Sequence, residues 1–169
     1  MIHFEEHYDS RFVKSLTADS SIVECTFEDC KSNVPGGGAC LGGNFFLLID
    51  SCRFMNCQSM REGGGLYVQT SITNVSRTTF DSCGSCLNGL GSLMTSSVQN
   101  NLFLSTYVLC RSLRATGSYA AFDLYHHPST TKFVNGSHLF SIGRECGYHH
   151  GGGPISYLGY STFSSCIGP

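Results

Sequence analysis

Ten cysteines give this chain of 169 residues its most obvious capacity for chemistry. The first closely spaced ones are Cys25, Cys30, Cys52 and Cys57. Paired cysteines are the usual ligands of structural zinc, but four thiolates must then converge on one ion. Here the cysteines continue past four at a regular spacing, which spreads them along an axis. We therefore expect a buried column of small apolar thiols, with disulfides and a metal site as the alternatives.

The segment Cys83-Gly84-Ser85-Cys86 matches the C-x-x-C pattern of thiol oxidoreductases. A redox motif of this kind needs a helix to begin at the motif, because the helix N-terminus lowers the thiol pKa. The sequence predicts no helix there, so we interpret this pair as structural.

Two Tyr-His-His triplets are the other candidate metal ligands. Their imidazoles belong to His126, His127, His149 and His150. If the triplets met on adjacent turns of a repeat structure, the four side chains could bind a transition metal. The alternative is that they lie in two solvent-exposed loops of similar composition, and we expect no metal or other cofactor.

Carboxylates are scattered along the chain. Glu28 and Asp81 share a repeat position, but they lie two repeats apart, about 10 Å by strand spacing, and Met55 stands between them. Enzymes that cleave polysaccharides use a closer carboxylate pair on one face. We therefore predict no catalytic residues, and a polysaccharide lyase or hydrolase remains the alternative function.

A repeat of 26–27 residues organises all of these side chains, and such a period indicates a solenoid. Phe27 and Cys30 return as Phe54 and Cys57, 27 residues later, and then as Phe80 and Cys83. The predicted inward ladders are Phe27, Phe54, Phe80, Tyr107 and Phe133, and Cys30, Cys57, Cys83 and Cys110. The glycine triplets also recur, and we expect corners at Gly36, Gly37, Gly38, Gly63, Gly64 and Gly65, because glycine accepts positive φ.

These patterns predict an all-β protein, a right-handed parallel β-helix of about five to six coils. Three short strand patterns are visible in each repeat, and short segments rich in β-branched and aromatic residues favour strands. Residues 1–20 carry no clear repeat and are expected to form an N-terminal cap, an incomplete first coil or an irregular start, with a helix over 4–16 as one possibility. Residues 21–169 are expected to form the repeat domain, with an inserted loop near 143–150.

Composition limits the partners. The net charge is −2 and charged residues make up 13%, so no basic surface for nucleic acid or for an anionic membrane is expected. The many cysteines favour an oxidising, extracellular or cell-surface location. No signal peptide is visible at the N-terminus, and no apolar run is long enough to span a membrane. We expect the chain to be part of a longer polypeptide.

The recurring motifs resemble the repeat of polymorphic outer membrane proteins, which pairs Phe-x-x-Asn with Gly-Gly-Ala-aliphatic. The matching segments are Phe27–Cys30, Phe54–Cys57, Phe80–Cys83, Gly37–Cys40 and Gly64–Tyr67. The chain carries Cys where that family has Asn, as a divergent, cysteine-rich branch would. The resemblance implies a pectin-lyase-like β-helix and a non-catalytic, adhesin-like surface module that presents a flat face to a host or neighbouring-cell protein or glycan. A structural spacer is a further alternative.

Overall fold

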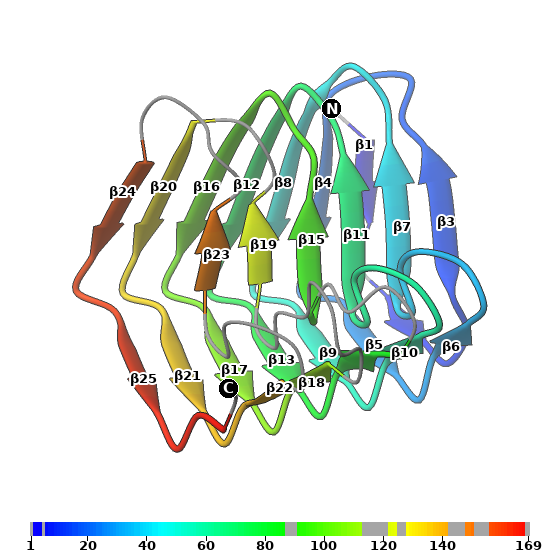
Figure 1. Cartoon of the computed structure of the whole chain (residues 1–169). Coiled ribbons are helices and arrows are strands. Elements are labelled where there is room, and N and C mark those ends of the chain that lie inside the picture. Colours follow the sequence, from blue (N-terminus) through cyan, green and yellow to red (C-terminus); the bar gives the residue numbers. More distant parts are fainter. Residues whose placement is uncertain are drawn as a thin grey trace.

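The computed structural model describes residues 2–4, 6–86, 91–112, 122–124, 128–141, 148–150 and 156–167. These residues form β-strands and no helix, and the strands pair in parallel between successive turns of the chain. The protein is a parallel β-solenoid with four sheets running along its axis (Figure 1). In the described part of the chain, no helix is long and apolar enough to cross a membrane.

Sheet A contains β1 (Ile2–Phe4), β4 (Ser20–Val23), β8 (Phe46–Asp50), β12 (Ile72–Ser76), β16 (Gln99–Phe103), β20 (Ser129–Lys132) and β24 (Ser156–Gly159). Sheet B contains β2 (His7–Tyr8), β5 (Thr26–Glu28), β9 (Arg53–Met55), β13 (Thr79–Asp81), β17 (Thr106–Val108), β21 (Asn135–Ser137) and β25 (Thr162–Ser164). Sheet C contains β3 (Phe12–Ser15), β7 (Ala39–Gly42), β11 (Leu66–Gln69), β15 (Leu93–Thr95), β19 (Phe122–Leu124) and β23 (Tyr148–His150). Sheet D contains β6 (Lys31–Ser32), β10 (Gln58–Ser59), β14 (Gly84–Ser85), β18 (Arg111–Ser112) and β22 (Phe140–Ser141).

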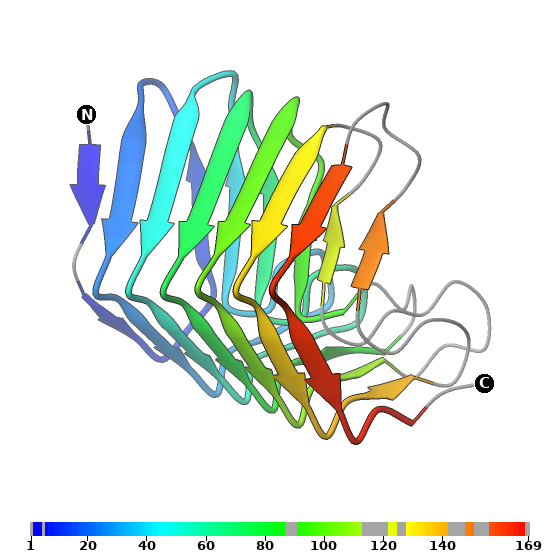
Figure 2. The ribbon, with the colours of Figure 1, turned by 90° about the vertical axis from the view of Figure 1, so that its left-hand side faces the viewer.

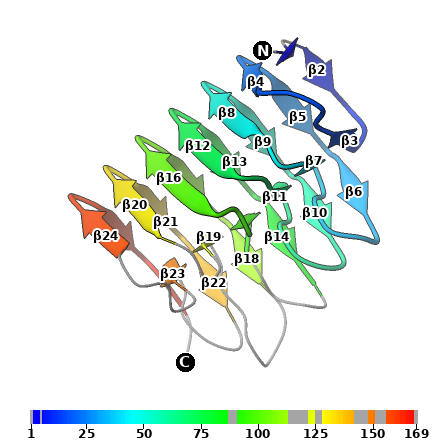
Figure 3. The same cartoon turned by 90° about the horizontal axis from the view of Figure 1, so that it is seen from above.

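A complete coil therefore runs through four strands, one more than the three patterns visible in the sequence. The additional strand lies in sheet D and is only two residues long, too short for a periodic signal. Figure 3 shows the coils following one another along the axis, and Figure 2 shows sheet A from β1 to β24. Side chains alternate between the interior and the surface, as in any strand.

The N-terminal segment is already part of the solenoid, so a helix over 4–16 and an irregular start are both wrong. β1 pairs with β4, β2 with β5 and β3 with β7, which makes residues 2–15 a coil in register with the next one. Tyr8 stacks on Phe27 with ring centroids 4.9 Å apart. The repeat is not apparent in this part of the sequence, because neither a glycine triplet nor a cysteine accompanies Tyr8.

Left-handed backbone at fixed positions turns the chain between sheets. Twelve non-glycine residues of the described chain have φ near +50°, two in each turn from Glu24 onward. One stands between sheets A and B, as Ser51 does, and one between sheets B and D, as Asn56 does. The residue after each points inward, as Cys52 and Cys57 show. A strand of three residues held between two such corners is the constant unit of the fold.

The predicted aromatic ladder is present over four coils. Phe27, Phe54, Phe80 and Tyr107 are buried. Their rings stack in sequence with centroids 4.5, 4.9 and 4.9 Å apart and planes within 5° of parallel. Stacked aromatic neighbours of this kind stabilise the fold beyond the area they bury.

Phe133 does not continue the ladder, and that prediction is wrong. The strand partner of Tyr107 is Gly136, whose own partner in the next coil is Phe163. Phe133 instead has φ +54° at the corner between sheets A and B and is 41% exposed. Two more residues separate Arg111 from Phe122 than separate the equivalent Gly84 and Leu93, and this shifts the register of the later coils.

The glycine triplets lie between sheets D and C, and Gly36 and Gly63 have the positive φ expected of corners, +77° and +61°. The other four are needed for space. A Cβ on Gly37 would lie 2.1 Å from the Gly64 carbonyl oxygen, and one on Gly38 would lie 2.8 Å from Cδ1 of Phe54. Gly64 and Gly65 are equally crowded in the next coil.

Candidate functional site

Six of the described cysteines line the interior as thiols. Cys30, Cys57, Cys83 and Cys110 are at most 1% exposed. Each thiol can donate a hydrogen bond to a carbonyl of the preceding coil: Cys57 to Phe27 at 3.4 Å, and Cys110 to Phe80 at 3.3 Å. Burial raises the pKa of Cys110 to about 12. The Cys110 thiol therefore stays protonated, and a protonated thiol is a poor nucleophile or metal ligand.

The two cysteines of the C-x-x-C segment occupy different environments. Cys83 is buried in the thiol column, whereas Cys86 is half-buried and lines a cavity of about 160 Å³ beside Lys31 and Gln58. No helix begins at this segment, because Gly84 and Ser85 form strand β14. The arrangement gives neither thiol the helix terminus that a redox motif uses.

The structure places the second histidine triplet, and its register partners are not histidines. Tyr148–His150 form β23, not part of an inserted loop, and β23 pairs with β19 so that His149 lies opposite Asp123 and His150 opposite Leu124. His126 and His127 lie outside the described residues. Among the residues that the structure does describe, no three His, Cys, Asp or Glu side chains are placed to hold a metal ion.

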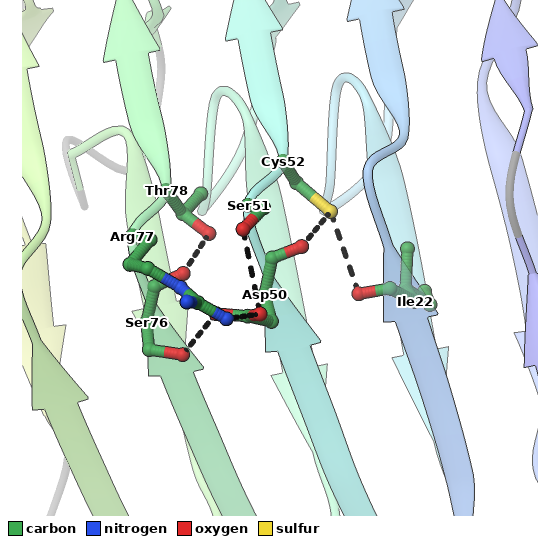
Figure 4. Close-up of polar contacts among 7 residues, drawn as sticks. All are labelled: Ile22, Asp50, Ser51, Cys52, Ser76, Arg77 and Thr78. Carbon is green, nitrogen blue, oxygen red and sulfur yellow. Dashed lines mark hydrogen bonds and ion pairs between the residues drawn. The ribbon is translucent and has the colours of Figure 1, made fainter.

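The carboxylates are arranged as the sequence predicts. Glu28 pairs with Met55 and Met55 with Asp81, so the two acids flank an uncharged residue. A different carboxylate is enclosed. Asp50 accepts hydrogen bonds from Arg77, from Ser76 at 2.5 Å and from Ser51 at 3.4 Å (Figure 4).

The Asp50–Arg77 pair joins two coils at the corner between sheets A and B. The Arg77 Nε–H donates to Asp50 at 2.9 Å, and a second guanidinium nitrogen also contacts the carboxylate. The hydrogen bond from Arg77 lowers the pKa of Asp50, against the effect of burial. Since its oxygens are already engaged, we interpret Asp50 as a structural acceptor.

The type of residue at the corner between sheets A and B changes along the axis. Its left-handed residues are Glu24, Ser51, Arg77, Leu104, Phe133 and Tyr160, in coil order. The first three are charged or polar and the last three are large and apolar. Phe103 precedes Leu104 and also faces outward. We call Phe103, Leu104, Phe133 and Tyr160 the aromatic corner.

The side chains of the aromatic corner are exposed by 40%, 47%, 41% and 77%, respectively. The rings of Phe103 and Phe133 meet edge to face with centroids 5.5 Å apart. Those of Phe133 and Tyr160 stack at 5.3 Å and 10°. Stacking covers one face of Phe133 and one face of Tyr160, and Tyr160 still keeps most of its surface in contact with solvent.

The sequence did contain a signal for this corner. Small or apolar inward residues recur at a spacing of five in the coils from Cys25 to Leu139, as Cys52 and Cys57 do and as Ser105 and Cys110 do. The residue before each is a left-handed corner. Reading that spacing instead of the aromatic period would have placed Phe133 before the inward Val134.

No protein-family model matches the chain, and neither the curated proteins nor the solved structures gave a match. The likeness to polymorphic outer membrane proteins therefore rests on the short repeat motifs alone.

Proposed function

We propose that this protein is a non-catalytic, adhesin-like binding module, secreted or displayed at a cell surface, whose contact site is the aromatic corner. The observation that carries the proposal is that three large apolar residues, Leu104, Phe133 and Tyr160, combine left-handed backbone with solvent exposure.

Each of these features is unfavourable in the isolated protein. Left-handed backbone costs a residue with a side chain about 1–2 kcal/mol, which is why glycine, asparagine and aspartate are favoured there. An exposed apolar side chain also keeps its surface in water. The equivalent corners in earlier coils carry Glu24 and Ser51, so the fold does not require an aromatic residue at this position. Backbone strain that stability does not explain is characteristic of binding sites.

The size of the patch fits a binding site. The exposed parts of its three aromatic rings and one leucine amount to roughly 400 Å², taking the usual surface of these side chains. Exposed apolar patches of this size on monomeric proteins are often functional.

The rings suit a protein partner and leave a surface for a glycan as well. Sugars pack against the flat face of an aromatic ring, and Tyr160 is 77% exposed although one of its faces stacks on Phe133. Ring edges suit insertion between apolar side chains of a protein, where aromatic residues contribute most of the binding energy. The surface location is supported by the resemblance of the repeat motifs, which is an argument by analogy.

The test is solid-phase binding to immobilised collagen, laminin and fibronectin, to the protein itself, and to a printed glycan array. The variant Phe133→Asn/Tyr160→Asn removes both rings and keeps the backbone, since Asn56 already occupies such a corner. Ser51→Asn is the matched control in an early coil. We expect at least tenfold weaker binding for the double variant only. Equal binding by the double variant, or no binding to any surface by the wild type, would contradict the proposal.

A further inference from the structure

Beside the aromatic corner, the outer face of sheet B becomes uncharged. Its outward residues in the last three coils are Thr106, Val108, Asn135, Ser137, Thr162 and Ser164, which we call the neutral face. In earlier coils the same two rows carry Glu28, Arg53 and Asp81. The change happens in the same coils as the change at the aromatic corner.

A second, partly apolar rim borders the neutral face on its other side. Leu109 occupies the corner between sheets B and D with φ +52° and is 54% exposed. Phe140 in sheet D and Ile167, which bridges to it, are 39% and 65% exposed. The exposed residues His138, at the same corner, and Arg111, the register partner of Phe140, also belong to this rim. Small polar side chains thus lie between the aromatic corner and a rim of mixed character over the same coils.

We infer that a second copy of this chain packs against the neutral face and its two rims. This inference rests on the proposed function and identifies the partner, so that adhesion is between like molecules. Three properties of the surface support it: its area, the lack of charge on the neutral face itself and its period.

The area suits a dimer of moderate affinity. The seven large apolar residues of the two rims alone expose roughly 700 Å² of side-chain surface, counted from typical side-chain areas. A standard interface buries about 800 Å² on each partner. The aromatic corner alone would cover only about half of that, so it needs the face beside it.

The absence of charge suits a two-fold contact. In such a contact the same patch is used on both copies, so any charge near the axis meets its own like. The six residues of the neutral face carry no formal charge. In the earlier coils the same face carries Glu28 and Asp81, and these carboxylates would repel the same carboxylates of a second copy. Small side chains also allow two sheets to approach to about 10 Å.

The period suits a second solenoid. Rows of side chains on the face repeat once per coil, at the strand spacing of about 4.8 Å. A second copy presents rows at the same spacing along its whole length, so its ridges can lie in the grooves of the first without a growing mismatch.

Sedimentation velocity across a hundredfold range of protein concentration tests the inference. Val108→Glu places a carboxylate at the centre of the neutral face, in a row where Glu28 and Asp81 already occur, so folding is preserved. Met55→Glu makes the same change in the same row of an early coil and is the control. We expect a monomer–dimer equilibrium in the micromolar range for the wild type and Met55→Glu, and at least tenfold weaker dimerisation for Val108→Glu.

The outcomes separate this inference from the proposed function. A wild type that stays monomeric, or a Val108→Glu variant that dimerises normally, overturns the second copy as the partner. If such a protein still binds an immobilised matrix protein or a glycan through Phe133 and Tyr160, the binding function stands with a different partner. Loss of dimerisation in Met55→Glu as well would also overturn the inference, because the early coils would then be involved.

Discussion

Phe54 and Phe133 provide the sharpest test of the fold. Both follow the 26–27-residue period of the sequence, but one is buried and the other is at the surface. Phe54 is 1% exposed and lies between Phe27 and Phe80, with centroid distances of 4.5 and 4.9 Å. Phe133 is 41% exposed at a corner. We compare Phe54→Ala with Phe133→Ala, which delete the same atoms.

The expected loss for Phe54→Ala is about 4 kcal/mol, since removing a buried phenylalanine costs about 3–5 kcal/mol. The loss includes two stacked ring pairs, each contributing about 0.5–1.5 kcal/mol. For a domain of this size, that loss corresponds to a fall in Tm of roughly 8–16 °C. Phe133→Ala removes a half-exposed ring and should cost less than about 1 kcal/mol.

Urea unfolding followed by far-UV circular dichroism measures both variants, with the midpoint shift as the readout. Phe54 sits in a central coil, so its loss weakens the contacts with the coils on both sides. Equal destabilisation by the two substitutions would refute the assignment of Phe133 to the surface. A loss below about 1 kcal/mol for Phe54→Ala would refute the inward stack itself.

Two further predictions concern the glycine corner and the ion pair. Gly38→Ala should destabilise the folded protein by about 1–3 kcal/mol, because its Cβ would lie 2.8 Å from Cδ1 of Phe54. Gly42→Ala is the control, since the nearest atom to its Cβ would be 3.7 Å away. We expect that variant to be as stable as the wild type in the same unfolding assay. Unchanged stability of Gly38→Ala would show that the ring is not held against that loop. The pKa of Asp50 in the folded protein lies below its ordinary value, chiefly because of the hydrogen bond from Arg77. The ionised Asp50 side chain therefore contributes to stability above about pH 4, and this contribution is lost as the pH falls further. Arg77→Asn should therefore move the midpoint of acid unfolding, followed by circular dichroism, to higher pH. Arg53→Gln removes a positive charge elsewhere and should leave that midpoint unchanged. Identical acid midpoints in the two variants would contradict the role of the ion pair.

Part of the candidate site could be predicted and part could not. The buried thiols, the separation of Glu28 from Asp81 and the stack up to Tyr107 follow from residue types that recur once per coil. The aromatic corner was missed because Phe133 keeps the 26-residue period by coincidence. Its true equivalents in the two preceding coils are Arg77 and Leu104, neither of which is aromatic.

By itself, the sequence determined that the chain is a β-solenoid with glycine corners and an interior of stacked aromatic rings and thiols. Those features repeat because each coil must fill the same interior and pass the same crowded turn, so selection acts on residue type at a fixed period. Only the tertiary structure decided which large apolar residues face outward. That depends on the sign of φ at single corner residues and on the pairing register between coils. The register of the later coils is set by contacts with the preceding coil, and the two extra residues between Arg111 and Phe122 displace it from the count along the chain.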